Sequence, residues 1–221
     1  DSVVGEETCK AIVDRGAKVF FTAVDVADTP SLKAWIEGVG EKEGKIDALI
    51  PNAAAFVFGG IEEVDDEAWD KVLSVNVRGY ANTVKFALPF LKVSAASGTT
   101  SSVVFMASVS CFIAQPSFIP YNASKGAIIQ LCRCLAMDLG PFGIRVNAVA
   151  PGTIDTPATD LHAAKLKMTK EELTRDAVKS HFLKRLGTTL ECAMATLFLA
   201  SPESSFTTGS ALMVDGGLTA H

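Results

Sequence analysis

A tyrosine and a lysine four positions apart indicate proton-transfer chemistry. Residues 121–125 read Tyr-Asn-Ala-Ser-Lys, and this spacing puts Tyr121 and Lys125 on one face of a helix, one turn apart. A free phenol has a pKa near ~10 and is a poor acid or base at neutral pH. A neighbouring positive charge favours the phenolate and lowers the barrier to proton transfer. The spacing therefore predicts Tyr121 as a general acid/base and Lys125 as its activator.

Two further polar residues fit the same chemistry. Ser108 follows the apolar run 103–107, and Asn76 falls on the apolar stripe of a helix. Reduction of a ketone by hydride transfer leaves charge on oxygen, which Ser108 could stabilise with a hydrogen bond. A buried asparagine must find partners, and Asn76 could hold a water that relays protons to Lys125. The four residues together predict an alcohol or ketone oxidoreductase.

The residue types and their spacing give little evidence for other reaction classes. None of the three histidines, His162, His181 and His221, lies beside a strand-end serine, and no Gly-x-Ser-x-Gly motif is present. No His/Cys/Asp cluster has the spacing of metal ligands. Cys132 and Cys134 lie two apart in a helical stretch, so they point to different faces. We therefore expect neither an acyl-transfer hydrolase nor a metal site.

Length, composition and charge limit the classes of protein to which the chain can belong. The chain has 221 residues, of which 48% are hydrophobic, and a net charge of −5. These values predict one domain, residues 1–221, with a large core. The absence of a basic run disfavours a nucleic-acid partner, and no apolar run is long enough to span a bilayer. The five scattered cysteines and the lack of a signal-peptide pattern favour a cytoplasmic protein.

Strands and helices are expected to alternate along the chain. The predicted strands are residues 17–21, 22–26, 46–50, 103–107, 144–149 and 211–214, and the predicted helices are residues 4–15, 31–43, 65–91, 121–139, 169–183 and 191–200. Short continuous apolar strands are typical of parallel strands covered on both faces, so we expect an open, doubly wound α/β sheet. Ligands bind at the carboxyl ends of such strands. Asn52, Ser108 and Pro151 all follow predicted strands.

With these motifs in place, the chain resembles the short-chain dehydrogenase/reductase family from Gly5 to Gly217. The shared motifs are Asp25-Val26, Asn52-Ala53, Asn76-Val77-Arg78-Gly79, Ser108, Tyr121-x-x-x-Lys125, Arg145-Val146-Asn147-Ala148-Val149, Pro151-Gly152-x-x-x-Thr156, Thr208-Gly209 and Val214-Asp215-Gly216-Gly217. The resemblance implies a single Rossmann-type domain, NAD or NADP as cofactor and a small alcohol or ketone substrate. It also implies a homodimer or homotetramer, in which helices near residues 69–91 and 121–139 pair with a second subunit.

The resemblance assigns roles residue by residue. The implied catalytic tetrad is Asn76, Ser108, Tyr121 and Lys125. The implied cofactor-binding residues are Gly5, Asp25, Val26, Asn52, Ala53, Tyr121, Lys125, Pro151, Gly152, Ile154 and Thr156. Asp25 and Val26 would contact the adenine, and Asn52 and Ala53 the adenosine ribose. A substrate lid is expected over about residues 157–186, and the candidate substrate residues are Ser108, Ser110, Cys111, Gln115, Phe118, Leu161 and His162.

The sequence also departs from the family pattern. Residues 51–54 read Pro-Asn-Ala-Ala where the family usually has Asn-Asn-Ala-Gly. The family's first strand, most of its Gly-rich phosphate loop and one crossover helix have no counterpart, and Gly5 matches the last glycine of that loop. Predicted strands 17–21 and 22–26 leave no room for the crossover of about a dozen residues that parallel neighbours need. Either the sequence is part of a longer polypeptide, or the usual pyrophosphate cradle is absent.

Two alternative functions follow from these departures. A cofactor-poor pseudoenzyme that acts as a binding or scaffold protein is favoured by the missing phosphate loop and opposed by the intact Ser108, Tyr121 and Lys125. A family member that eliminates halide without nicotinamide is opposed by Lys125, since that chemistry is associated with arginine at this position. The choice between NAD and NADP is made by charge just after the second strand, where the expected segment is absent.

Overall fold

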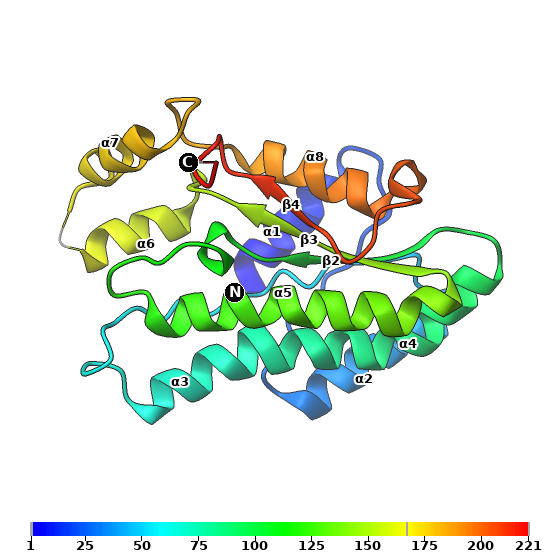
Figure 1. Ribbon diagram of the computed structural model, residues 1–221. Coiled ribbons are helices and arrows are strands. Elements are labelled where there is room, and N and C mark those ends of the chain that lie inside the picture. The colour runs from blue at the N-terminus through cyan, green and yellow to red at the C-terminus, as the bar shows by residue number, and fades with distance from the viewer. Residues whose placement is uncertain (1, 167, 221) are drawn as a thin grey trace.

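Four parallel strands form the centre of the protein. The computed structural model describes residues 2–166 and 168–220, and it leaves the side chains of Leu161, His162 and Lys165 undescribed. The strands are β1 (Ala48–Leu49), β2 (Ser101–Met106), β3 (Ile144–Pro151) and β4 (Ala211–Val214), in the order β1-β2-β3-β4. Every neighbouring pair is parallel. Helices lie on both sides of this sheet (Figure 1), so the expected doubly wound, Rossmann-like α/β fold is confirmed.

Hydrophobic side chains on the two faces of β2 belong to two separate cores. Val103 and Phe105 pack on one side in a large cluster with α2 (Thr29–Glu43), α4 (Tyr80–Ala96) and α5 (Ile119–Leu139). Val104 packs on the other side with Leu199 of α8 (Thr189–Ala200). Successive side chains of a strand point to opposite faces. This explains why a continuous apolar run, rather than an alternating one, encodes β2.

Two polar side chains in β3 attach the C-terminal part of the chain to the sheet. Arg145 is buried, and its guanidinium donates to Leu199 O at 2.9 Å and to Ser201 O at 2.9 Å. These carbonyls lie at the C-terminal end of α8, where backbone acceptors have no intrahelical partner. Asn147 donates to Thr207 O at 2.8 Å and so holds the turn that leads to β4. The Arg-x-Asn spacing of this strand is therefore structural.

The long helix predicted over residues 65–91 contains a π-helical segment. It begins at α3 (Asp66–Leu73), whose N-cap Asp65 accepts from Ala68 N at 2.8 Å. The segment η1 (Ser74–Gly79) widens the helix before α4 continues it. Such π-helical segments occur frequently at functional sites. This one contains Asn76.

The strands predicted over residues 17–21 and 22–26 are wrong. Helix α1 (Ser2–Val13) is followed by an extended chain that pairs with no strand in the described part of the protein. An extended segment becomes a strand only when a neighbour satisfies its backbone N–H and C=O groups. Val24 and Val26 still pack against the core through their side chains. The hydrophobic pattern was therefore correct about burial and wrong about pairing.

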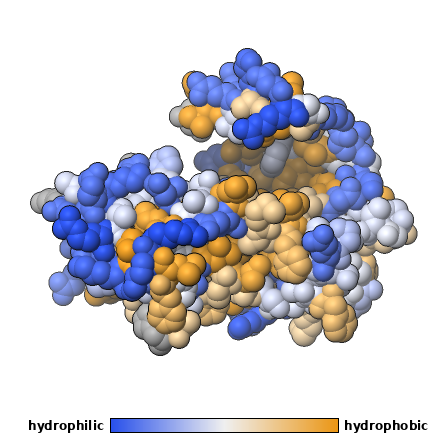
Figure 2. Space-filling model, turned by 90° about the horizontal axis from the view of Figure 1, so that it is seen from above, coloured by the Kyte–Doolittle hydropathy of each residue, from blue (hydrophilic) through white to orange (hydrophobic). Residues whose placement is uncertain are grey.

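Strand β1 forms one edge of the sheet. β1 pairs only with β2 among the described strands. Viewed from above relative to Figure 1, the molecule has a hollow in which hydrophobic side chains lie (Figure 2).

The expected lid, residues 157–186, contains α6 (Pro157–Lys165) and α7 (Lys170–Ser180). The helix predicted to end at residue 183 ends at Ser180, because His181 has an extended backbone.

Replacement of Arg145 tests the role of β3. Arg145→Met removes the charged donors to Leu199 O and Ser201 O, which keep only weaker, uncharged donors such as Ser204 Oγ. We expect the free energy of unfolding to fall by about 2–4 kcal/mol in chemical denaturation, since buried charged hydrogen bonds are costly to break from one side. Arg133→Met, at an exposed position of α5, is the control and should change it by less than about 0.5 kcal/mol. Equal stability of the two variants would contradict this assignment.

Candidate active site

Tyr121 lies in the first turns of α5 beside the loop that follows β2. Its side chain is 8% exposed. Burial raises the pKa of Tyr121 above its ordinary value, and a side-chain hydrogen bond with Ser108 acts in the opposite direction. Ser108 itself has an extended backbone, and its Oγ accepts from Ser110 N at 3.1 Å. The structure therefore brings together the two hydroxyls that the sequence predicted.

Lys125 is a buried ammonium one turn further along α5. Its side chain is 1% exposed, and Nζ donates to Met106 O at 2.8 Å, at the end of β2. Nζ also lies 5.6 Å from the ring centroids of both Tyr80 and Tyr121. Burial lowers the pKa of Lys125 to about 8. The ammonium has three N–H donors, and Met106 O is its one acceptor among the described residues.

The two pKa shifts modify the expectation drawn from the Tyr-x-x-x-Lys spacing. Desolvation is the largest cause at both Tyr121 and Lys125, and it disfavours the charged form of each group. In the free protein the phenol of Tyr121 is thus held neutral rather than activated as a phenolate. A neutral phenol beside a protonated amine is suited to donate a proton.

Asn76 connects the loop after β1 to α5. Its Oδ1 accepts from Ala55 N at 2.8 Å, and its Nδ2 donates to Ala55 O at 3.0 Å and to Ser124 Oγ at 2.9 Å. Ser124 Oγ in turn donates to Tyr121 O at 2.7 Å. Both N–H groups of the fully buried amide are therefore used by protein. The arrangement assigns the Asn76 side chain to positioning of the Tyr121 turn, and the expected water would have to bind elsewhere on this residue.

Sequence reasoning missed Tyr80, Phe56 and Phe58 at this site. Tyr80 is buried, and its hydroxyl donates to Met106 O at 3.2 Å, the same carbonyl that Lys125 uses. Phe56, Phe58 and Phe118 have rings within 6.2 Å of the Tyr121 ring, centroid to centroid. Of these, only Phe118 was a predicted site residue. The signal available in the sequence was the position of Phe56 and Phe58 just after a strand end.

The predicted residues of the adenosine side come from three different segments, and only Asn52 and Ala53 follow a strand. Asn52 and Ala53 follow β1 and are exposed. Asp25 accepts from Ala27 N at 2.9 Å, which makes a turn, and Val26 packs closely on Gly79 of η1. Gly5 lies inside α1, where a Cβ would overlap the ring of Phe21. Glycine at this position lets the Phe21 ring pack directly on the backbone of α1.

The loop after β3 holds the predicted nicotinamide residues. A Cβ on Gly152 would lie 2.9 Å from Asp215 Cα, so only glycine lets the ends of β3 and β4 approach this closely. His181, which sequence reasoning did not assign, accepts from Thr153 N at 3.4 Å and faces Ala177 O through Nδ1 at 2.7 Å. It thereby ties the end of α7 to the loop that contains Pro151, Gly152, Ile154 and Thr156.

The predicted substrate residues are partly brought together. Ser110 Oγ donates to Gln115 Oε1 at 2.7 Å, and Phe118 contacts Tyr121. Cys111 is half-buried; its thiol donates to Lys125 O at 2.9 Å, and burial raises its pKa to about 11. It is therefore a protonated, unreactive thiol at neutral pH. The side chains of Leu161 and His162 lie outside the described residues.

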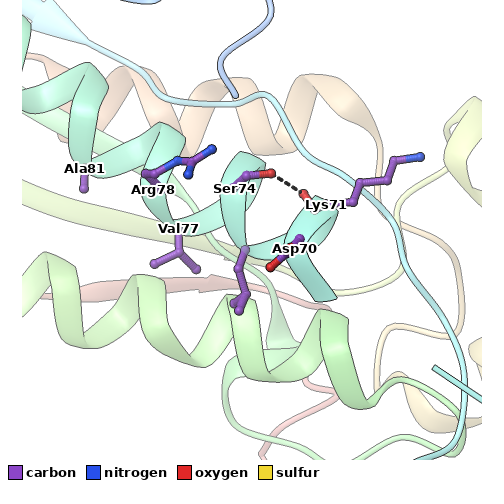
Figure 3. A pocket seen from close by; sticks show the side chains of 7 residues that line it. Asp70, Lys71, Ser74, Val77, Arg78 and Ala81 are labelled. Atoms are coloured by element: carbon purple, nitrogen blue, oxygen red, sulfur yellow. Dashed lines mark hydrogen bonds between the residues drawn. The ribbon is translucent and has the colours of Figure 1, made fainter. Parts of the chain in front are cut away.

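One surface pocket lies along α3, η1 and α4, away from this site. It has a volume of about 560 Å³ and follows one side of α3, η1 and α4 (Figure 3). Its lining residues are Asp70, Lys71, Leu73, Ser74, Val77, Arg78 and Ala81. A second pocket of about 420 Å³ lies between α1 and the chain near Phe21 and includes Gly5. Neither pocket contains Ser108, Tyr121 or Lys125, so neither is assigned to the chemistry.

The described part of the chain offers neither a metal site nor a membrane-spanning helix. No group of three or more His, Cys, Asp or Glu side chains there is arranged to hold a metal ion. Among the helices of residues 2–166 and 168–220, none combines the length and hydrophobicity that a bilayer crossing requires.

Comparison with known proteins identifies dehydrogenases and reductases as relatives of this chain. Residues 2–219 match the family model described as enoyl-(acyl carrier protein) reductase. The chain is 32% identical to human dehydrogenase/reductase SDR family member 4, covering 96% of this chain and 73% of that protein. It is 31% identical to cyclopentanol dehydrogenase of Comamonas sp., covering 99% and 84%. The structure of gluconate 5-dehydrogenase from Burkholderia cenocepacia, with NADP and tartrate, superposes with a TM-score of 0.87 at 27% identity, covering 97% and 81%.

Removal of the Asn76 side chain tests its positioning role. Asn76→Ala breaks three buried hydrogen bonds and leaves a cavity, so we expect the free energy of unfolding to fall by about 2–4 kcal/mol in chemical denaturation. Asn82→Ala is the matched control, because the half-buried Asn82 makes one long hydrogen bond, to Thr29 Oγ1 at 3.2 Å. That variant should lose less than about 1 kcal/mol. If Asn76→Ala lost no more than its control, the connection would not be structural.

Burial of Lys125 predicts a dependence of stability on pH. A change of its pKa from 10.5 to about 8 corresponds to roughly 3 kcal/mol of unfavourable burial of the charge, at ~1.4 kcal/mol per pKa unit. This penalty is fully present below about pH 8. It disappears as pH rises to about 10.5, because the unfolded chain then binds more protons than the folded one.

Lys125→Met removes the buried charge, and Met106 O keeps its hydrogen bond from Tyr80. We expect the variant to be more stable than the parent by about 1–3 kcal/mol at pH 7, with the difference shrinking between pH 8 and pH 10. Thermal denaturation across this range is the measurement. Lys85→Met, at an exposed position of α4, should show no such trend. A variant less stable than the parent at pH 7 would refute the penalty.

Proposed function

The chain belongs to the short-chain dehydrogenase/reductase family of oxidoreductases, and on this premise we propose that it interconverts a secondary alcohol and a ketone with NAD(H) or NADP(H). The single observation that carries this proposal is the contact of Ser108 and Tyr121 beside the buried ammonium of Lys125. Perturbed ionisable groups of this kind concentrate at functional sites. The relative named cyclopentanol dehydrogenase and the NADP-bound gluconate 5-dehydrogenase support both the substrate class and the cofactor class.

The proposed mechanism assigns one task to each residue. Ser108 and Tyr121 donate hydrogen bonds to the substrate oxygen and so fix its position. When bound, the nicotinamide supplies or accepts the hydride at the substrate carbon. In the reduction, Tyr121 Oη gives its proton to the oxygen, and its raised pKa fits a group that is fully protonated beforehand. The nearby Lys125 ammonium stabilises the phenolate that remains.

The residues present fit the nicotinamide half of the cofactor. The buried Lys125 ammonium has N–H groups beyond the one that Met106 O accepts, and they are suited to ribose hydroxyls. The loop Pro151–Thr156 is held by the close approach of Gly152 to Asp215 and by His181. Asn52 and Ala53 expose backbone on the adenosine side. The described residues supply no glycine-rich loop for the pyrophosphate.

A binding or scaffold protein that lacks catalysis is the second candidate. The buried Lys125 opposes it, because burial of an ammonium with one described acceptor is unfavourable. A protein without catalysis has no need to retain that charge. We therefore place the enzyme first.

The proposal includes a homodimer or homotetramer, and a cytoplasmic location remains a prediction. The helices expected to pair with a second subunit carry exposed apolar side chains, including Leu73 at 39%, Val93 at 52% and Met137 at 74% exposure. Apolar surface of this kind is often covered by another subunit.

Replacement of the phenol tests the mechanism. Tyr121→Phe should lower kcat by at least about 100-fold, because the general acid is lost, while NADH or NADPH binding, followed by fluorescence titration, stays within about three-fold. The other tyrosine of the chain provides the control. Tyr80→Phe loses one long hydrogen bond to Met106 O and should keep kcat within about three-fold. Near-parental turnover by Tyr121→Phe would overturn the mechanism, and failure of the parent to bind either nucleotide would favour the scaffold.

A further inference from the structure

Three phenylalanine rings surround the catalytic phenol. Phe56 stacks on Tyr121 with ring centroids 5.2 Å apart and an angle of 16° between the rings. Phe58 lies 6.0 Å from Tyr121 and 4.6 Å from Phe118, and Phe118 meets Tyr121 edge to face at 6.2 Å. Offset-stacked and edge-to-face pairs at such distances are favourable. We call Phe56, Phe58 and Phe118 the aromatic cluster.

The aromatic cluster is assembled from two loops that the backbone joins. Gly59 N donates to Ser117 O at 2.7 Å, and Gly59 forms an isolated parallel bridge with Phe118. A Cβ on Gly59 would lie 2.6 Å from Val64 Cγ2, so the close packing at this point requires glycine. The loop after β1 and the loop before α5 are therefore fixed to each other. The rings are presented by a joined scaffold rather than by independent loops.

The cluster is open on one side. The Phe56 side chain is 46% exposed, whereas the Tyr121 side chain that it covers is 8% exposed. The surface beside the proton donor thus offers ring faces and edges. In the turn before Phe118, the Ser110 hydroxyl is already used, since Ser110 Oγ donates to Gln115 Oε1 at 2.7 Å.

A substrate whose oxygen is bound by Ser108 and Tyr121 must place its neighbouring carbons within reach of these rings. Hydroxyl groups on those carbons would lose water without gaining hydrogen-bond partners, which is unfavourable. A flat apolar ring at the same place would gain aromatic packing and release water from exposed apolar surface.

We propose that the substrate is a ketone, or the corresponding secondary alcohol, whose oxygen-bearing carbon lies in or next to an aromatic or other flat apolar ring, and that Phe56 is a specificity-determining residue. This inference rests on the proposed function. It separates this chain from the relative named for gluconate and brings it closer to the one named for cyclopentanol. Polyhydroxylated ketones are then poor substrates.

Competing substrates test the inference directly. Initial rates of NADH and NADPH oxidation are measured with 1-tetralone and with 5-keto-D-gluconate. We expect kcat/KM for 1-tetralone to be higher by about 100-fold, which is the size of the discrimination that an apolar site achieves against added hydroxyl groups. In Phe56→Ala the ratio of the two kcat/KM values should fall by about 10-fold, mainly through KM for 1-tetralone. Because both substrates use Tyr121, the ratio cancels any change at the phenol itself.

Phe206→Ala is the matched control, because Phe206 is a fully exposed phenylalanine in the turn after α8. It should leave both kcat/KM values within about two-fold. A preference for 5-keto-D-gluconate, or an equal loss with both substrates in Phe56→Ala, would overturn the inference.

Binding separates failure of this inference from failure of the proposed function. Line broadening of the aromatic proton signals of 1-tetralone is followed by NMR with the parent protein and with Phe56→Ala. If the line broadening is smaller with Phe56→Ala than with the parent protein, the inference is supported. If no carbonyl compound is turned over in that case, the proposed function alone fails. Absence of broadening with the parent, together with absence of turnover of 1-tetralone, overturns the inference.

Discussion

The burial of one positive charge organises the candidate site. Lys125 is 1% exposed, and its ammonium is held by the carbonyl of Met106 at the end of β2. A charge in such a place is unfavourable unless neighbouring groups are fixed around it. The surroundings meet this need, because Tyr80 and Tyr121 place their rings within 5.6 Å of the ammonium. The same low-polarity environment keeps the phenol of Tyr121 protonated, so one physical cause sets the state of both groups.

Hydrogen bonds and close contacts between distant segments position the rest of the site around Lys125. Asn76, in the π-helical segment η1, joins Ala55 of the loop after β1 to Ser124 of α5. Gly152 allows the ends of β3 and β4 to approach within van der Waals contact. Each connection joins segments far apart in sequence at the carboxyl edge of the sheet. This is the edge at which open parallel sheets bind ligands, and the polar groups of the site are fixed there by backbone contacts and by the buried side chain of Asn76.

The N-terminal part shows how strongly a strand depends on its neighbours. Residues 17–26 carry the apolar pattern of strands, and Val24 and Val26 pack on the core, but no described strand lies next to this segment to satisfy its backbone. β1 likewise pairs on one side only. Side-chain burial and backbone pairing are separate requirements, and a sequence pattern reports mainly the first. In the aromatic cluster, by contrast, a backbone bridge between two loops brings together rings that no periodic sequence pattern relates.

The sequence by itself determined the four parallel strands with helices between them, the extents of β4 and α5 to within two residues, and the spacing that aligns Tyr121 with Lys125 on one helix face. These features depend on local geometry and on hydrophobic periodicity, which a linear chain encodes directly. Only the tertiary structure decided that burial raises the pKa of Tyr121, that the Asn76 amide is used up by Ala55 and Ser124, and that Phe56 covers the phenol. Desolvation and contact depend on which distant segments meet, and that is a property of the folded chain.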